Sequence, residues 1–535
     1  MEKRLFLAVF LSLVVVFGFQ TVFKSKNIPS QETQTIVINA YKVEGTAPAI
    51  AASPSLPAVE KKPSLFIEKT IALENAQYLV NITNKGGNID QIHLKEYSYL
   101  SPAKSLLNFD MFENEEFKTE LVGNKKARVY YKSADWQITK EYTLNDDYTI
   151  TATITIKNVS DKARSLTGKR SDFIVDTSRL DSHNVQSDFM LYEYSIKTDK
   201  RMVRKDNARN FSDKWNKEEV SPVEWAAFRD KYFVTLVQPQ APEANYLIKT
   251  VSDKELFIGS TLMGVIVDPG AVVLYNYKIY AGPQQLDLLN KADKAFSKVM
   301  VFSNWGWLDA IAKAIYWLLG TIHKIIPNWG LCIIFISLIV YGLMYPLTAK
   351  SLVSMKKLQT LQPKMKELQE KYKSNPERLN KEIVELYRVH QVNPLGGCLP
   401  MLFQMPIFVG LYQVLWRSVY FRGQSFLWMK DLSLPDHTLK LPFTIPFLGE
   451  YLNILPVIMV AVMAVQQNLN MKTMVTANPE QAQQQKIMAI FFPILIGFIF
   501  YNMASGLNLY FVIFYILSTL SQWHISRNMQ AVSAV

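Results

Sequence analysis

Neutral polar side chains recur inside several long apolar runs in the last 235 residues of the chain. Their hydroxyl and amide groups can form hydrogen bonds and hold water, which is a chemistry of binding. At roughly 100° per helical residue, the polar side chains of one run fall within about 80° of arc. On the run 329–348 they are Ser337, Tyr341, Tyr345 and Thr348. On the last run Asn508, Tyr515, Thr519 and Gln522 do the same, and Gln404 adds an amide from a third run.

Two interpretations of these polar stripes remain open. Polar groups that face lipid are costly, so each stripe must face protein or water. Ser, Thr and Gln often serve as hydrogen-bonding links between helices, each contributing about 0.6 kcal/mol. The residues alone favour such links, and a water-filled groove is the alternative.

Residues that could perform a reaction are missing from these runs. They contain no paired Asp and no constellation built around His, so we expect no catalytic residue and no enzyme. Cys332 and Cys398 have no metal-ligand spacing, and we expect small buried side chains, no metal and no cofactor. The net charge is +12, but where apolar runs enter a membrane the position of Lys and Arg matters more than their sum. We expect no direct nucleic-acid substrate.

The N-terminal part of the sequence predicts a membrane anchor and a linker. Lys3 and Arg4 precede an uncharged run of 19 residues, 5–23, which as a helix would rise about 28 Å. No A-x-A-like site follows it, so an uncleaved signal anchor over 1–24 is favoured over a cleaved signal peptide. Residues 25–62 are rich in Pro, Ala and Ser and predict a flexible periplasmic linker.

Residues 63–300 predict an all-β sandwich domain. The stretch TITATITI, 149–156, alternates strictly, and Asn145-Asp146-Asp147 before it indicates a hairpin turn. Lys85-Gly86-Gly87-Asn88 joins two more strand-like runs, and AVVLYNYKIYA continues the pattern. An antiparallel sandwich that serves folding and docking is favoured over a sugar-processing site.

An interfacial helix and a charged hairpin flank the first core span. Residues 301–328 predict an amphipathic helix held at the interface by Trp305, Trp307 and Trp317. The span 329–349 follows, and then residues 350–397 predict a helical hairpin in which Asn375-Pro376 starts the second helix. Residues 350–392 hold ten Lys and Arg against five acids. Basic loops stay in the cytoplasm, so both termini are expected there and the β-domain outside.

Four further spans complete the expected order. They cover 398–417, 450–469, 487–502 and 507–524, joined by a periplasmic loop 418–449 and a cytoplasmic loop 470–486, and followed by a short cytoplasmic tail 525–535. Pro400 and Pro406 are expected to bend the span that carries Gln404, because proline removes a backbone donor. The apolar run 487–501 would rise about 22 Å, less than the bilayer core, and predicts local thinning.

Several motifs resemble the YidC insertases of Gram-negative bacteria, part of the Oxa/Alb superfamily. They are NPLGGCLPMLFQMPIFVGLY, GLMYPLTAK, QQQKIMAIFFP and SGLNLYF, and the resemblance covers the whole chain. It implies an α-helical membrane protein of six transmembrane helices, five of which form the insertase core, with an inserted all-β periplasmic sandwich domain. It also implies that the chain inserts apolar segments of nascent proteins into the inner membrane, alone or with the Sec translocon, and assists their folding. A hydrophilic groove open to cytoplasm and lipid would do this.

The resemblance also assigns site residues and partners. It carries over Ser337, Tyr341, Gln404, Asn502, Tyr510 and Phe511, and with Tyr345 and Asn508 from the polar stripes these are the expected groove residues. Where the family has a groove arginine, in a V-R-G-x-M-Y-P-L setting, this chain has Tyr341; Phe511 stands where the family has the second of two substrate-contacting tyrosines. Ribosome contact would use the hairpin and the 470–486 loop, and membrane lipids surround the spans. The alternative function is a polytopic transporter or channel, which would predict inverted repeats or an intramembrane ion site.

Overall fold

The computed structural model describes residues 66–179, 192–208, 211–219, 221–243, 245–373, 375–390, 392, 399–445, 448–473 and 479–533. The expected anchor 1–24, the linker 25–62 and the turn with Cys398 therefore lie outside the described residues. Cys332 is buried, as its apolar setting predicted.

The β-domain contains three antiparallel sheets. The four-stranded sheet has the order β1 (Thr70–Glu74), β2 (Tyr78–Thr83), β3 (Ile89–Leu94), β4 (Tyr99–Leu100). The nine-stranded sheet has the order β13 (Met202–Ala208), β12 (Tyr192–Thr198), β15 (Val223–Arg229), β16 (Phe233–Pro239), β19 (Val272–Pro283), β10 (Thr149–Asn158), β9 (Trp136–Leu144), β8 (Lys126–Lys132), β7 (Lys118–Leu121). The six-stranded sheet has the order β14 (Lys217–Glu219), β17 (Tyr246–Thr250), β18 (Glu255–Val267), β11 (Arg164–Asp176), β5 (Ala103–Lys104), and β6 (Asn108–Phe109) also pairs with β11.

The period-two pattern correctly predicted the central strands. On β10 the side chains of Ile150, Ala152, Ile154 and Ile156 are buried, and Thr151 between them is exposed. The turn after Leu144 connects β9 to β10, and Gly86 and Gly87 connect β2 to β3 with φ of 67° and 64°. A side chain at Gly87 would also lie 2.9 Å from the ring of Phe117, so both the backbone and the space require glycine there.

The nine-stranded and six-stranded sheets share one core. Arg170 on β11 lies 5.0 Å from the ring centroid of Tyr277 on β19, and the rings of Phe109 on β6 and Tyr275 on β19 are 5.8 Å apart. These contacts join side chains from two different sheets, which is the packing of a sandwich. A short helix, α2 (Leu286–Ala292), follows β19, so the domain is not purely β.

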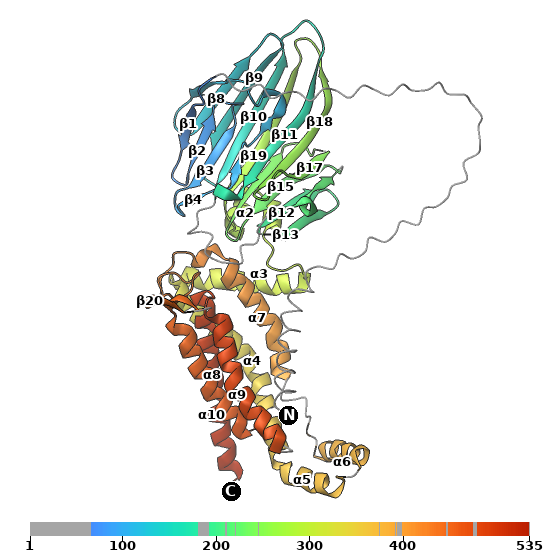
Figure 1. Ribbon diagram of the computed structural model, residues 1–535, viewed down its shortest axis with the longest axis vertical. Helices are drawn as coiled ribbons and strands as arrows, with labels where there is room; N and C mark the ends of the chain where they lie inside the picture. The colour runs from blue at the N-terminus through green and yellow to red at the C-terminus, as the bar shows by residue number, and fades with distance from the viewer. Residues whose placement is uncertain are drawn as a thin grey trace, which may run out of the picture. The chain divides into compact units, whose positions relative to one another are not determined.

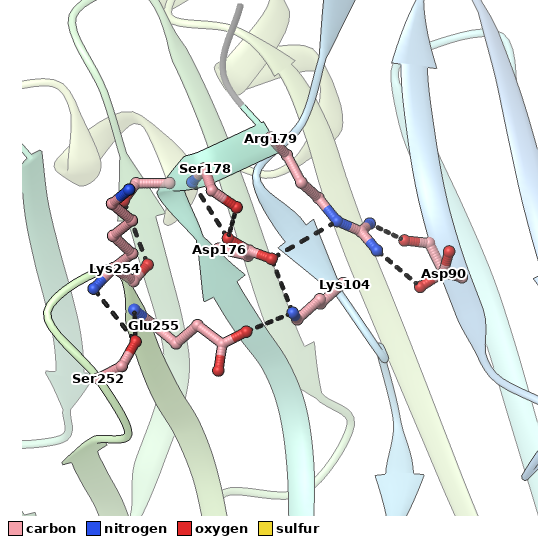
Figure 2. A network of polar contacts seen from close by, with 9 residues as sticks. Asp90, Lys104, Asp176, Ser178, Arg179, Ser252, Lys254 and Glu255 are labelled. Carbon is pink, nitrogen blue, oxygen red and sulfur yellow. Dashed lines mark hydrogen bonds and ion pairs between the residues drawn. The ribbon is translucent and has the colours of Figure 1, made fainter.

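A network of ion pairs ties the four-stranded sheet to the six-stranded sheet (Figure 2). Arg179, just after β11, donates to the carbonyl of Asp90 on β3 at 2.7 Å. Lys104 on β5 bridges Asp176, at 2.7 Å, and Glu255. Burial raises the pKa of Asp176, but hydrogen bonds from Lys104 and Ser178 outweigh it and hold that pKa below its usual value. The carboxylate is therefore ionised at neutral pH and fixes the end of β11.

The rest of the described chain is helical apart from one hairpin. The helices are α3 (Gly306–Ile325), α4 (Trp329–Thr360), α5 (Gln362–Lys371), α6 (Pro376–Val389), α7 (Leu399–Arg417), α8 (Ile454–Thr473), α9 (Pro479–Phe500) and α10 (Ser505–Ser533), and the hairpin pairs β20 (Leu439–Ile445) with β21 (Gly449–Leu452). Figure 1 shows α4, α7, α8, α9 and α10 running side by side, with α3 across them. Asn375 caps α6 by accepting from the backbone of Arg378 at 3.1 Å, as its Asn-Pro sequence predicted.

Helix lengths differ from the lengths of the apolar runs. The helix α4 continues through Thr360, α9 begins at Pro479, and α10 continues through Ser533. These extensions contain good helix formers such as Gln, Lys and Ala, so the helix goes on after the apolar run has ended. Within the described residues, two stretches are long and apolar enough to cross a membrane, Trp329–Met355 and Ile454–Met471, and Lys486–Phe500 is a shorter apolar stretch.

Lys140 on β9 makes a testable contribution to the stability of the β-domain. Lys140 is 1% exposed, and its ammonium group donates to the carbonyls of Gly86 and Leu107 and to Asn88 Oδ1, at 2.7, 3.0 and 2.6 Å. Burial lowers the pKa of Lys140 to about 7, against about 10.4 in an unfolded chain. Between these two pKa values Lys140 is protonated in the unfolded chain but mostly neutral in the folded chain. Raising the pH therefore favours the folded state, and the free energy of unfolding should rise by about 2 kcal/mol from pH 7 to pH 9.

Pulse proteolysis of the full-length protein in urea, following fragments from β9 and β10, measures this rise. The variant Lys140→Met should be less stable and should lose the rise between pH 7 and pH 9. An identical rise in the variant would show that another group causes it.

Candidate functional site: polar groups between apolar helices

The helix α10 lies between α4, α7 and α8 and carries polar side chains toward each of them. Gln404 on α7 donates from Nε2 to the hydroxyl of Tyr510 at 3.1 Å, and Tyr510 is fully buried. Phe511 lies next along α10, with its ring 5.3 Å from that of Phe408 on α7. The structure therefore brings together three of the expected site residues, Gln404, Tyr510 and Phe511.

Tyr341 on α4 faces the same region. Its ring is buried, 5.7 Å from that of Phe514 on α10 and 6.4 Å from that of Tyr345 one turn further along α4. Tyr345 is 39% exposed, so it marks an edge of the cluster. The hydroxyl of Tyr341 is buried and forms no hydrogen bond within 3.5 Å in the described part of the chain, although the side chain of Ser521 on α10 lies near enough to interact with it.

Three other expected residues have local contacts. Ser337 is buried and donates to the carbonyl of Ile333 in its own helix at 2.6 Å. Asn508 is buried and donates to the carbonyl of Phe500 at 3.1 Å, so it holds the turn between α9 and α10. Asn502 is exposed in that turn. Asn502 was expected from the family resemblance and Asn508 from the polar stripe of the last span, and both stay predictions.

The prolines of α7 differ in position. Pro400 is the second residue of the helix, where a missing backbone N–H leaves no hydrogen bond unmade, so it starts the helix and does not bend it. Pro406 lies inside the helix, as do Pro346 in α4 and Pro493 in α9. Interior prolines on three helices free carbonyl groups at three places in the bundle.

A second polar group, between α8 and α10, was missed by the sequence analysis. Gln466 donates to Ser518 Oγ at 2.6 Å, and Gln522 donates to Asn470 Oδ1 at 2.7 Å. The spacing could have revealed them, because Gln466 and Asn470 are four residues apart on one helix and Ser518 and Gln522 are four apart on the other. Gln522 had been noted, but the α8 partners had not.

Several buried polar atoms between these helices have no partner among the described residues. They are the Tyr341 hydroxyl, Gln413 Oε1, Asn508 Oδ1 and Thr519 Oγ1. An unsatisfied buried polar atom costs about 1–3 kcal/mol, and ordered water is the usual way to avoid that cost. These four atoms lie on three different helices, α4, α7 and α10.

The surroundings of this cluster are apolar and uncharged. The sequence has no Asp, Glu, Lys or Arg in 329–349, 399–416, 454–471, 487–500 or 505–523. The outward faces of the helices carry large apolar side chains, for example Leu343 at 69% and Ile490 at 66% exposure. Such faces are typical of surfaces that contact lipid. Across the described residues, no three His, Cys, Asp or Glu are grouped to hold a metal ion.

Comparisons with known proteins place this architecture in a family. Residues 321–532 match the family described as 60Kd inner membrane protein, and residues 110–318 match the family described as YidC periplasmic domain. The chain is 30% identical to the membrane protein insertase YidC of Chlorobaculum tepidum, over 87% of this chain and 83% of the relative. It is 35% identical to that of Chlorobium phaeovibrioides over 61% of this chain, a match that spans 56% of the relative. The alignment with a solved structure of an active YidC insertase covers 85% of this chain and 92% of the insertase chain, with 18% identity and a TM-score of 0.36.

The contact between Gln404 and Tyr510 can be tested by a double-mutant cycle. Gln404→Leu and Tyr510→Phe each remove one partner of a hydrogen bond that lies between apolar helices. We expect a coupling free energy of about 0.6–1.7 kcal/mol, measured by steric trapping in a bilayer. Additive losses in the double variant would show that the two side chains do not interact.

Proposed function

Because the chain belongs to the YidC family of membrane protein insertases, we propose that it guides its substrates along a hydrated polar path between α4, α7, α8 and α10. The family fixes the activity: the chain is an insertase of the inner membrane, and its substrates are nascent membrane proteins. The path is the part that we infer from this chain's own residues, and we expect it to work without a chemical step.

The buried, unpaired polar atoms between the helices are the observation that carries this proposal. A hydrophilic tail that crosses a bilayer loses its hydrogen bonds to water, at several kcal/mol for each unsatisfied group. Water held near the Tyr341 hydroxyl would replace some of those bonds. The substrate's apolar segment would move along the lipid-facing side, driven by burial of about 25 cal/mol for each Å² of apolar surface.

The apolar stretch of α9 supports a second contribution, which is a thinner bilayer. The helix is 22 residues long, but its apolar part runs only from Lys486 to Phe500. Fifteen residues rise about 22 Å, less than the hydrocarbon core of about 30 Å. Local thinning would shorten the distance over which a polar tail is dehydrated.

Neutral groups are proposed to do the work that a groove arginine does elsewhere in the family. Tyr341 stands at that position, and its ring contacts Phe514 in a region without charged residues. Lys350 and Arg417 lie just outside the apolar runs and are expected at the interfaces. We therefore propose that Tyr341, Tyr345, Gln404 and Tyr510 meet the substrate through hydration and hydrogen bonds, not through a fixed charge, and that Phe511 adds only an apolar ring contact. Ser337, Asn502 and Asn508 stay predicted groove residues.

The proposed topology has six transmembrane helices. Five are α4, α7, α8, α9 and α10, and the sixth is the expected anchor 1–24. The basic hairpin of α5 and α6 would lie in the cytoplasm with both termini, and the β-domain in the periplasm. Exposed Trp305, Trp307 and Trp317 support an interfacial position for α3.

The partners of this topology are also proposals. The hairpin of 350–397 and the loop 470–486 would meet a ribosome, and the chain would act alone or beside the Sec translocon. A transporter or channel is the other function considered. It would need an ion site between the helices, and the neutrality of the core runs disfavours it.

Substitutions at Tyr341 test the neutral path. Tyr341→Phe removes one hydroxyl, worth about 0.6 kcal/mol, so insertion of a substrate with a polar tail should fall by no more than about threefold. Tyr341→Asp adds a negative charge and should impair acidic tails more than neutral tails, because like charges repel strongly where the dielectric is low. Tyr341→Asn is the matched neutral control, and the readout is insertion into proteoliposomes.

Equal loss for neutral and acidic tails in Tyr341→Asp would contradict the electrostatic argument. A loss of a hundredfold in Tyr341→Phe would contradict the claim that this hydroxyl is one of several sharing the task.

A further inference from the structure

The loop between α7 and α8 exposes large apolar side chains at the end of the helical bundle where α8 begins (Figure 1). They gather at two points. The first is a tight turn, 426–429, in which the backbones of Phe426 and Met429 exchange two hydrogen bonds of 2.9 Å. The second is the hairpin β20–β21, whose two strands pair with no third strand in the described chain.

The turn exposes Leu427 and Trp428 beside the start of α4. Leu427 is 71% exposed and has a φ of 52°, a left-handed backbone that leucine rarely adopts. Trp428 next to it is also exposed. The ring of Phe426 packs so closely on Gly330, the second residue of α4, that a side chain at Gly330 would lie 2.0 Å from it. The turn is therefore held where the apolar run of α4 begins.

Hydrogen bonds tie the base of the hairpin to two helix ends. Asn453 Oδ1 accepts from the backbone of His437 at 2.9 Å, and Asn453 Nδ2 donates to the carbonyl of Tyr501, just after α9, at 2.8 Å. Asp436 accepts from the backbone N–H of Leu455, in the first turn of α8, at 2.7 Å. These bonds fix the hairpin where α8 begins and α9 ends.

Beyond this base the hairpin is exposed and mostly apolar. Five of the seven residues of β20 are exposed, among them Phe443 at 61% and Leu439. The two charged residues of the hairpin, Lys440 and Glu450, pair with each other at 3.4 Å, so the hairpin is neutral. A two-stranded hairpin is at most marginally stable in water, and exposed large apolar side chains mark a surface that contacts something else.

A lipid bilayer is the partner that this position favours. The stretches Trp329–Met355 and Ile454–Met471 are long and apolar enough to cross a membrane, and the turn and the hairpin lie beside their first residues. Side chains at that level meet the boundary between headgroups and acyl chains, where Trp, Phe and Leu are favoured. The unpaired backbone groups of the hairpin edges can still bond to water and headgroups there, which the acyl core would not allow.

We propose that the turn and the hairpin insert four apolar side chains into the outer leaflet: Leu427, Trp428, Leu439 and Phe443. The proposal rests on the topology proposed above, in which α4 and α8 span the membrane and this loop is periplasmic. It also bears on the proposed thinning, because the hydroxyl of Tyr501 donates to the carbonyl of Tyr451 on β21 at 3.0 Å. The inserted hairpin would thus hold the end of the short apolar stretch of α9 at the outer surface.

The test measures the depth of single labels on the full-length protein in nanodiscs of phosphatidylcholine. The dye NBD would be attached to one cysteine at a time in a cysteine-free background, at Leu427→Cys or Phe443→Cys. Leu439→Cys gives a second hairpin position should Phe443→Cys not fold. The matched control is Ile266→Cys on β18, because that side chain is just as exposed, at 72%. Leu343→Cys on α4 is the reference for the acyl core.

We expect a nitroxide lipid labelled near the headgroup to quench the dye about threefold more at 427 and 443 than at 266, because apolar groups inserted at an interface lie about 5–10 Å below it. Adding phosphatidylglycerol should not change this ratio, because the hairpin is neutral and apolar burial holds it. Quenching at 427 and 443 that is no stronger than at 266 would overturn the proposal. So would quenching that appears only with phosphatidylglycerol.

The same labels in proteoliposomes identify any other partner. If the dye at 443 is shielded from water only at a high ratio of protein to lipid, a second copy of the chain covers the hairpin. If it is shielded only while a substrate is being inserted, the substrate covers it. Either result would overturn the proposal, whereas shielding that is independent of both supports it.

The Tyr341 variants separate this proposal from the proposed function. If insertion by those variants does not follow the prediction while 427 and 443 contact lipid, the polar path is wrong and the lipid contact stands. If 427 and 443 contact water while insertion follows the prediction, only the lipid contact is wrong.

Discussion

The need to hydrogen-bond every polar group that is removed from water governs the helical part of this protein. Gln404 and Tyr510 satisfy each other, and so do Gln466 and Ser518. The Tyr341 hydroxyl and Thr519 Oγ1 are buried and have no protein partner in the described chain. In lipid such groups are tolerated where water reaches them. The same requirement applies to the tail of a substrate, so water on the proposed path would also lower the cost of moving the tail.

The β-domain meets the same requirement in a different way. The three donors of the Lys140 ammonium group all have acceptors at hydrogen-bond distance, and Arg170 is held by Asp172 and Glu243. The match is incomplete, because Arg170 Nε and Asp172 Oδ2 are buried without a partner among the described residues, so the β-domain also contains unsatisfied polar atoms.

The sequence predicted the fold better than it predicted the site. Alternation in TITATITI and the two turn motifs identified β9, β10, β2 and β3, because a strand that is buried on one face alternates apolar and polar residues. Apolarity, however, marks where a helix meets lipid and not where it ends, so the extent of α4, α9 and α10 was not predictable from it. The β20–β21 hairpin, within a loop without a strong pattern, was not foreseen.

Within the site, helical periodicity placed polar residues on a face but could not choose their partners. Tyr510 and Gln404 are 106 residues apart and meet only through the packing of α7 on α10. Asn508 lies on the same helix as Tyr510 yet bonds to the end of α9, since it sits within the first turn of α10. The pair Gln466 and Asn470 went unnoticed because each helix was considered by itself.

Hydration of the path between the helices can be measured directly. Nitroxide labels would be attached to cysteines at positions 337, 404 and 508 in a background without Cys332 and Cys398, with lipid-facing Leu343 and buried Leu411 as reference positions. Deuterium modulation of the spin echo in heavy water, with the protein in a bilayer, reports water beside each label. Our account predicts strong modulation at 404, and more at 337 and 508 than at 343 or 411. Modulation at all three positions as weak as at 411 would mean a dry interior and would contradict the account.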